Sequence, residues 1–212
     1  MLRLDEYLDC EHMNCADVSI DSFVIPPIEI DPDRIKILMI SEAPPEDLHD
    51  YYYSEGNPFY IQTTIQAFND AGILVTGIND IVDLGIYVTT AVKCGKTDYT
   101  IATNTIKECS YILEKEISYF PNVEIYMLMG DVAIRAMNYI WKRQTGKRVV
   151  PPGSTYKIRK EALYIDDIRV FPSYLQTGGN YLIEKSKRTM IAEDLREALA
   201  IVKSKAGQDG LL

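Results

Sequence analysis

The sequence lacks the features of membrane-spanning and low-complexity proteins. Its 212 residues contain no apolar run near the roughly 18 residues that a membrane helix needs, no fixed-period repeat and no low-complexity tract. No segment has the pattern of a signal peptide, which removes the usual setting for disulfide bonds. We therefore expect a cytoplasmic protein that has no membrane partner, and we expect it to be a monomer.

A long polar tract that would separate two domains is also absent. With 47% hydrophobic residues, the chain can bury one substantial core. We predict one domain over residues 36–204, preceded by an N-terminal arm over residues 1–35 and followed by a short tail over residues 205–212.

An overall excess of positive charge is missing as well, because the formal net charge is -9. This value excludes a globally basic nucleic-acid binder. Residues 142–160, however, contain seven basic residues and no acidic residue. This cationic segment is either a solvated loop or an element that contacts phosphates. For the second interpretation, the candidate DNA contacts are Arg143, Lys147, Arg148 and Lys157.

Short apolar runs alternate with helical patterns along the chain. The runs predict buried strands at residues 36–40, 86–92, 124–129 and 168–171. The patterns between and after them predict helices at residues 60–70, 103–120, 131–143 and 189–204. Such alternation favours an α/β fold with three layers, α/β/α, around a central four-stranded parallel sheet. In these sheets, functional sites form beyond the carboxyl ends of the strands.

The chain has four cysteines, at positions 10, 15, 94 and 109. Four thiolates can hold one metal centre, either an iron–sulphur cluster or a zinc ion. The ordinary alternative is four buried and inert thiols, since free cysteine is a common core residue. The cysteine count alone does not choose between these interpretations.

Two motifs lie near the end of the first predicted strand. Residues 41–45 read SEAPP, and residues 56–59 read GNPF at the start of a predicted helix. Glu42 can hold or deprotonate a water molecule, and the ring of Phe59 can stack on a planar ligand. Taken singly, Glu42 is more simply a capping or surface carboxylate and Phe59 a core aromatic.

Taken together with later motifs, these residues resemble the iron–sulphur (family four) uracil-DNA glycosylases. The motif TTAVKC at residues 89–94 ends in one cysteine, and a second cysteine, Cys109, follows in a predicted helix. MGDVA at residues 129–133 and VFPSY at residues 170–174 come after it. The order of these motifs along the chain is similar to their order in that family. The resemblance implies a base-excision enzyme that hydrolyses the N-glycosidic bond of uracil or another deaminated base, flipped out of single- or double-stranded DNA.

The resemblance also implies roles for particular residues. Glu42 becomes the catalytic residue, and the base-binding residues become Ala43, Pro44, Phe59, Thr90 and Gln176. A structural [4Fe-4S] cluster, with zinc as the alternative, is expected on Cys10, Cys15, Cys94 and Cys109. The spacing Cys10-x4-Cys15 is wider than the C-x2-C spacing of the family, so Cys10 is the least secure ligand of the set.

Two catalytic positions depart from the family pattern. The uracil-reading Asn falls where this chain has Thr90, and the active-site His falls where it has Leu175. Losing one donor to a developing anion slows the chemical step roughly a hundred- to a thousandfold. The alternative function is therefore a catalytically impaired relative that binds nucleic acid or a nucleotide without hydrolysis. Polar residues that can substitute for the histidine are His49, Gln176, Thr177 and Asn180.

Overall fold

The computed structural model describes residues 1–10, 15–97 and 100–209. Its central sheet has five strands in the order β5, β4, β7, β9, β8. The first four of these run parallel, as predicted: β5 (Ile86–Thr90), β4 (Ile37–Ser41), β7 (Ile125–Met129) and β9 (Ile168–Ser173). The α/β class and the parallel core are thus confirmed.

The predicted count of four strands is wrong, because β8 (Leu163–Ile165) pairs antiparallel with β9 at the edge of the sheet. The two strands are joined at Asp166 and Asp167, and Asp166 adopts a positive φ of 49°. Aspartate tolerates this conformation in tight turns. A strand of three residues that is not fully buried carries too little hydrophobic pattern to be recognised from the sequence.

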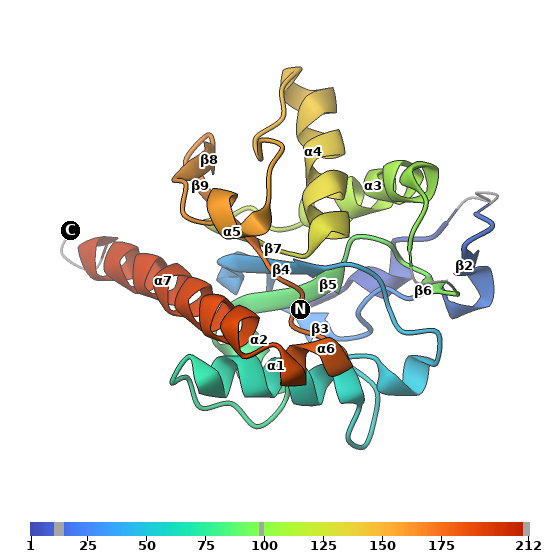
Figure 1. Cartoon of the computed structure of the whole chain (residues 1–212), viewed down its shortest axis with the longest axis horizontal. Coiled ribbons are helices and arrows are strands. Elements are labelled where there is room, and N and C mark those ends of the chain that lie inside the picture. Colours follow the sequence, from blue (N-terminus) through green and yellow to red (C-terminus); the bar gives the residue numbers. More distant parts are fainter. Residues whose placement is uncertain (11–14, 98–99, 210–212) are drawn as a thin grey trace.

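Two layers of helices cover the sheet (Figure 1). One layer contains α3 (Thr103–Ile117), α4 (Asp131–Thr145) and α5 (Thr155–Ile158). The other contains α1 (Phe59–Asp70), α2 (Ile78–Asp83), α6 (Gly179–Ile183) and α7 (Lys185–Asp209). Side chains alternate along each strand. In β4, Leu38 and Ile40 therefore pack in the core beneath α3 and α4, whereas Met39 packs in the core with α1 and α7.

The first 35 residues pack onto the sheet domain through short elements. The strand β1 (Leu2–Arg3) pairs with β3 (Glu29–Ile30), and β2 (Val18–Ser19) pairs with β6 (Gly95–Lys96). Single 3-10 turns occur in this segment at η1 (Leu4–Glu6), η2 (Ile20–Ser22) and η3 (Pro32–Arg34), and a fourth, η4 (Leu48–Asp50), follows β4. The pairing of β2 with β6 places this arm beside the segment that follows β5.

Within the described ranges, we find no helix with the length and hydropathy needed to span a membrane.

Candidate active site

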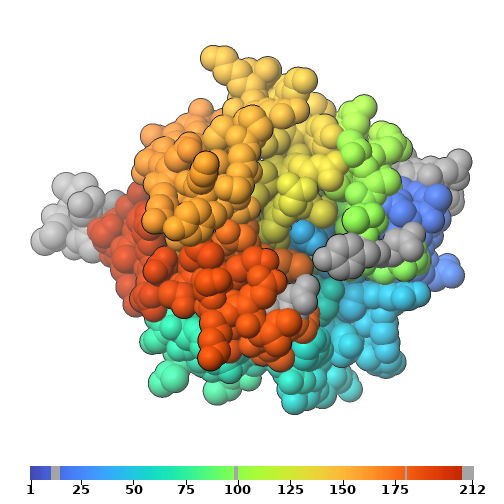
Figure 2. All heavy atoms as spheres, in the orientation of Figure 1, coloured from blue at the N-terminus to red at the C-terminus, as the bar shows by residue number. Residues whose placement is uncertain are grey.

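A cleft of about 690 Å³ lies at the carboxyl ends of the parallel strands. Glu42 after β4, Gly130 after β7 and Ser173 at the end of β9 contribute to its walls, together with the first turn of α4 and the segment around α6. Figure 2 shows this face of the molecule, with α4 in yellow and α6 and α7 in red-orange. Another cavity, of about 800 Å³, lies between α3 and α4 around Tyr111 and Trp141. The first cleft is the candidate site because charged and polar groups converge there at the strand ends.

Glu42 sits against the start of α4. Gly130, the residue before this helix, has a φ of +103°, and a Cβ atom on it would lie 2.6 Å from Oε1 of Glu42. Only glycine combines this backbone conformation with room for the carboxylate. Burial raises the pKa of Glu42, whereas Lys96 and the backbone N–H of Val132 act in the opposite direction. Glu42 is therefore a desolvated carboxylate held at the positive end of a helix, which suits a general base.

Three basic side chains line the same cleft: Lys96, Arg135 and Lys187. Arg135 pairs with Asp131 at 3.7 Å, and Lys187 pairs with Glu184 at 2.5 Å. Neither Lys96 nor Arg135 belongs to a motif or to a run of basic residues, so the sequence pattern alone does not assign them to the site. Lys96 lies in β6, shortly after β5, and Arg135 is the fifth residue of α4, so their common position at the strand ends becomes visible only with the sheet order.

The predicted DNA contacts lie further from the cleft. Arg143 is eight residues beyond Arg135 on α4, roughly 12 Å along the helix axis. Its guanidinium donates to Glu114 on α3 at 2.5 and 3.0 Å and stacks over the ring of Tyr111 at 4.0 Å. Lys147 and Arg148 follow, exposed, after the end of α4. Arg143 thus connects α3 to α4, and a contact with DNA would have to compete with these interactions.

Lys157 lies closer to the cleft, because it is exposed on α5, whose first residue, Thr155, lines the cavity. Its contact with DNA stays a prediction, as do those of Arg143, Lys147 and Arg148.

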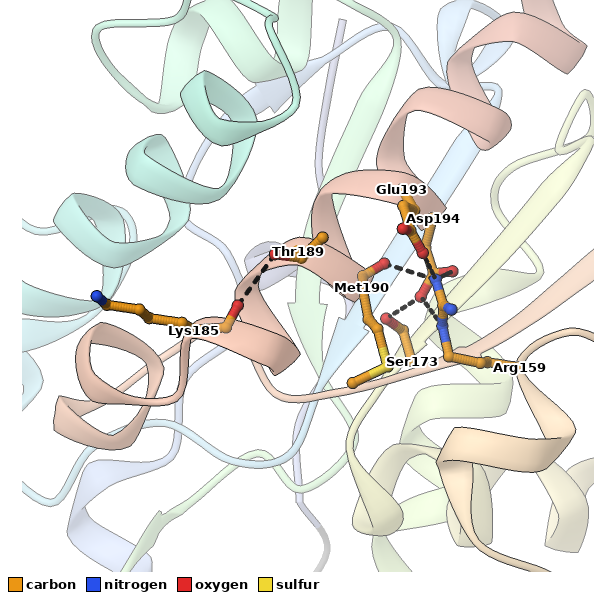
Figure 3. A network of polar contacts seen from close by, with 7 residues as sticks. All are labelled: Arg159, Ser173, Lys185, Thr189, Met190, Glu193 and Asp194. Carbon is orange, nitrogen blue, oxygen red and sulfur yellow. Dashed lines mark hydrogen bonds and ion pairs between the residues drawn. The ribbon is translucent and has the colours of Figure 1, made fainter.

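Arg159, near the end of the cationic segment, belongs to a buried network of hydrogen bonds and ion pairs (Figure 3). Its guanidinium donates to Asp194 at 2.6 Å, to Glu193 at 3.0 Å and to the carbonyl oxygen of Met190 at 2.8 Å. Asp194 also accepts a hydrogen bond of 2.5 Å from the hydroxyl of Ser173. This buried network fixes the cationic segment and the end of β9 to α7, and it therefore positions one wall of the cleft.

The predicted base-binding residues are distributed around the site. Ala43 and Pro44 are buried directly after Glu42, whereas Phe59 is half-buried at the start of α1. Among the described residues, Tyr60 of α1 lines the cleft, whereas Phe59 does not. Burial and the nearby charge of Glu42 raise the pKa of Tyr60 to about 12. The neutral phenol of Tyr60 is therefore an additional hydrogen-bonding group near Glu42.

Thr90 and Gln176 are fully buried behind the cleft wall. Leu175 and Thr177 line the cleft itself. Of the other residues considered as substitutes for the histidine, His49 is exposed on η4, and the side chain of Asn180 lies outside the part that the structure describes.

The four cysteines come together between the N-terminal arm, the segment after β5 and α3. Cys94 and Cys109 are buried, and Cys10 and Cys15 are half-buried. Burial, followed by the charges of the other three thiols, raises the pKa of Cys94 to about 12. Burial, with a contribution from Cys15 and Cys10, raises that of Cys109 to about 11. A bound metal centre would relieve this mutual repulsion, so the donor set fits such a group.

The described residues do not include three histidine, cysteine or carboxylate side chains grouped closely enough to hold a single metal ion. Four thiolates suit either an iron–sulphur cluster or a tetrahedral zinc ion.

A buried ion pair lies beside Cys94. Lys93 donates to Glu116 at 2.5 Å, and both side chains have no exposed surface. The hydroxyl groups of Tyr87 and Thr89 also donate to Glu116, each at 2.9 Å. The pair links the segment after β5, which carries Cys94, to α3, which carries Cys109.

A parallel α/β sheet with a carboxylate and basic groups at its strand ends defines an enzyme-like ligand-binding domain. A family model described as the uracil DNA glycosylase superfamily matches residues 27–197. The chain therefore belongs to the uracil-DNA glycosylase superfamily. No curated protein matches the sequence significantly.

Proposed function

We propose that the protein is a DNA glycosylase that hydrolyses the N-glycosidic bond of uracil or another deaminated base, flipped into the cleft. The observation that carries this proposal is Glu42, a desolvated carboxylate seated against Gly130 in a cleft at the strand ends. Membership of the superfamily supports glycosylase-like chemistry on DNA. A base must leave the stack before an enzyme can reach its glycosidic bond, and a cleft of this size has room for one nucleotide.

In this reaction, the ionised carboxylate of Glu42 orients a water molecule and accepts its proton. The water oxygen bonds to C1′ of the sugar while the bond from C1′ to the base nitrogen breaks, and its electron pair leaves with the base. The phenol of Tyr60 and the hydroxyl of Thr177 are among the neutral polar groups that line the cleft. Leu175, at the position of the family's histidine, contributes no hydrogen-bond donor.

The cleft cations supply the DNA-binding part of the proposal. Lys96, Arg135 and Lys187 can bind the phosphates on either side of a flipped nucleotide in single- or double-stranded DNA. Each phosphate contact releases counterions, so binding weakens as the salt concentration rises.

We also propose that Cys10, Cys15, Cys94 and Cys109 hold a [4Fe-4S] cluster with a structural role. The cluster would connect the arm to α3. Support comes from the convergence of the four thiols, which raise one another's pKa, and from the resemblance of the motifs to the iron–sulphur family. Iron, sulphide and zinc analysis of anaerobically purified protein tests the assignment: equal amounts of iron and sulphide support it, and one zinc per chain contradicts it.

The activity is tested by incubating anaerobically prepared protein with oligonucleotides that each carry one uracil, hypoxanthine or xanthine. Release of the free base and formation of an abasic site are measured, with an undamaged oligonucleotide as the control. Release of at least one deaminated base supports the proposal. Salt-dependent DNA binding without release of any base contradicts it and leaves the binding-only alternative.

A further inference from the structure

Lys96 differs from the two other basic side chains of the cleft, because those two have acidic partners. Arg135 pairs with Asp131 at 3.7 Å, and Lys187 pairs with Glu184 at 2.5 Å. Within the described ranges, the ammonium group of Lys96 has no ion-pair or hydrogen-bond partner, although the residue is half-buried in the cleft. A lysine amine that no other side chain engages is available to a ligand.

The backbone of Lys96 is fixed against the loop that carries Glu42. A Cβ atom on Gly95 would lie 2.5 Å from the carbonyl oxygen of Pro45, which belongs to this loop. Only glycine allows so close an approach between the two backbones. The N–H group of Gly95 also donates to the hydroxyl of Ser22 at 2.7 Å, and β6 pairs with β2. The side chain of Lys96 therefore starts from a point that the fold fixes beside the Glu42 loop.

Glu42 and Lys96 line the same cleft, and no ion pair of the described residues joins them. Burial has the largest influence on the pKa of Glu42 and raises it, and the positive charge of Lys96 comes next and lowers it. The two groups are therefore close enough to interact electrostatically and far enough apart to admit a ligand atom between them. An amine and a carboxylate in this arrangement can act on one carbon atom, the amine as nucleophile and the carboxylate as proton acceptor.

The reaction that suits such a pair is the formation of a Schiff base. A lysine amine forms a Schiff base with a carbonyl group once it has lost its proton, and a neighbouring carboxylate can accept that proton. The sugar of an abasic site in DNA opens to an aldehyde at C1′, which is a carbonyl group of this kind. Arg135 and Lys187 line the same cleft and can hold the flanking phosphates.

We propose that the cleft has a second activity, that of an abasic-site lyase, in which the Nζ atom of Lys96 is the nucleophile. This activity cleaves the DNA strand on the 3′ side of an abasic site. The inference goes beyond the proposed glycosylase function, because an abasic site of any origin is its substrate. The two activities also form a sequence, since hydrolysis of a glycosidic bond leaves an abasic site in the same cleft.

The first stage forms a covalent bond between Lys96 and the sugar. The ammonium group transfers a proton to Glu42, and the neutral Nζ atom adds to the aldehyde carbon C1′. The C1′ oxygen takes one proton from the nitrogen and a second from Glu42 and leaves as water. The lone pair of the nitrogen then completes a protonated imine, and Glu42 is ionised again.

The second stage cleaves the strand by elimination. Glu42 removes a proton from C2′, a double bond forms between C2′ and C3′, and the C3′–O bond breaks. The electron pair of that bond leaves with the phosphate oxygen of the 3′ fragment. Water then hydrolyses the imine, which releases an unsaturated aldehyde on the 5′ fragment and restores Lys96. The stage consumes only water and needs no oxidant.

Reductive trapping tests the proposal on the full chain. The probe is an oligonucleotide with one preformed abasic site, incubated with sodium cyanoborohydride, which reduces an imine to a stable secondary amine. We expect a covalent protein–DNA adduct that peptide mass spectrometry maps to Lys96 and, without the reductant, cleavage on the 3′ side of the abasic site. A tetrahydrofuran residue, which has no oxygen at C1′, should give neither product. Absence of an adduct, or an adduct on another residue such as Lys187, overturns the proposal.

Lys96→Arg separates a nucleophile from a phosphate contact. The guanidinium group keeps the positive charge but does not lose its proton in proteins, so it cannot form the imine. We expect the yields of adduct and cleaved strand, each measured per bound DNA, to fall to the level without protein. Lys115→Arg is the matched control, because Lys115 is exposed on α3 and outside the cleft, and it should keep the wild-type yields. Cleavage by Lys96→Arg at the wild-type yield overturns the proposal.

Failure of the glycosylase proposal gives a different result, because the preformed abasic site requires no base release. A protein that forms the Lys96 adduct and releases no deaminated base is a lyase without glycosylase activity. A protein that releases a base, forms no adduct and leaves the strand intact retains the glycosylase function and overturns the lyase inference.

Discussion

The contact between Gly130 and Glu42 gives the sharpest prediction, because one added methyl group disturbs the site while a second glycine of the same helix provides the control. In Gly130→Ala, the new Cβ atom would lie 2.6 Å from Oε1 and 3.0 Å from Cγ of Glu42. These atoms belong to the end of a side chain, so we expect the carboxylate to move away and the fold to remain. The displaced carboxylate no longer aims a water molecule at the substrate.

Two magnitudes follow for Gly130→Ala. The φ of +103° disfavours any residue with a Cβ atom, and this strain lowers the free energy of unfolding by about 1–2 kcal/mol. A misplacement of about 1 Å at a reacting group slows catalysis about 10²-fold. Urea unfolding measures the first quantity, and single-turnover release of uracil from an oligonucleotide measures the second.

Gly146→Ala is the matched control at the other end of α4. Gly146 has a φ of +77°, and a Cβ atom there would meet nothing within 4 Å. Its stability loss should therefore be similar, about 1 kcal/mol, while base release keeps the wild-type rate. A wild-type rate in Gly130→Ala, or an equal loss of activity in both variants, would refute the placement of Glu42 against Gly130.

Three further predictions concern charge and metal binding. Glu116→Gln should lower the free energy of unfolding by about 3–5 kcal/mol, because it leaves Lys93 buried and unpaired; Glu114→Gln, at a partly exposed ion pair, should lower it by at most about 1 kcal/mol. Base release should fall as the pH is lowered through the raised pKa of Glu42, at a higher pH than for an exposed glutamate, because the ionised carboxylate is the active form. Cys94→Ser should lose iron and unfold at a lower temperature, because the proposed cluster would no longer connect the arm to α3.

Each of these predictions has a result that contradicts it. Equal urea midpoints for Glu116→Gln and Glu114→Gln would show that breaking the buried ion pair costs no more stability than breaking the partly exposed one. If the rate of base release stays constant as the pH is lowered to the usual pKa range of glutamate, a desolvated Glu42 is not the general base. Full iron content in Cys94→Ser, determined by metal analysis, would exclude Cys94 as a ligand.

The same raised pKa of Glu42 has a consequence for stability with a defined sign. A carboxyl group with a raised pKa in the folded state is ionised first in the unfolded chain, so the folded state loses relative stability as the pH rises through that pKa. Glu42→Gln should therefore be more stable than the wild type near neutral pH and lose this advantage in acid. Urea midpoints at the two pH values check the sign.

The sequence was sufficient to predict the parallel strands and the position of Glu42, because both depend on local pattern. Apolar runs bounded by turn residues identify β4, β5, β7 and β9. Parallel strands then bring their carboxyl ends to one edge, which places residue 42 in a cleft. The order of the motifs also led to the superfamily that the family model confirms.

Features that depend on packing between distant segments could not be read from the sequence. Arg159 belongs to a run of basic residues, yet its partner, Asp194, lies 35 positions away. Lys96 and Arg135 meet in the cleft only through the sheet order. Tyr60, and not its neighbour Phe59, lines the cleft because the direction of a helical side chain depends on how α1 docks onto the sheet.

The most direct test of the central claim is single-turnover release of a deaminated base by Glu42→Gln, compared with the wild type and with Glu46→Gln. Glu46 is an exposed carboxylate in the same loop and serves as the control. We predict that Glu42→Gln slows base release by about 10²- to 10⁴-fold, the usual contribution of a general base, with unchanged DNA affinity. Glu46→Gln should keep the wild-type rate. Equal rates for the wild type and Glu42→Gln would contradict the account.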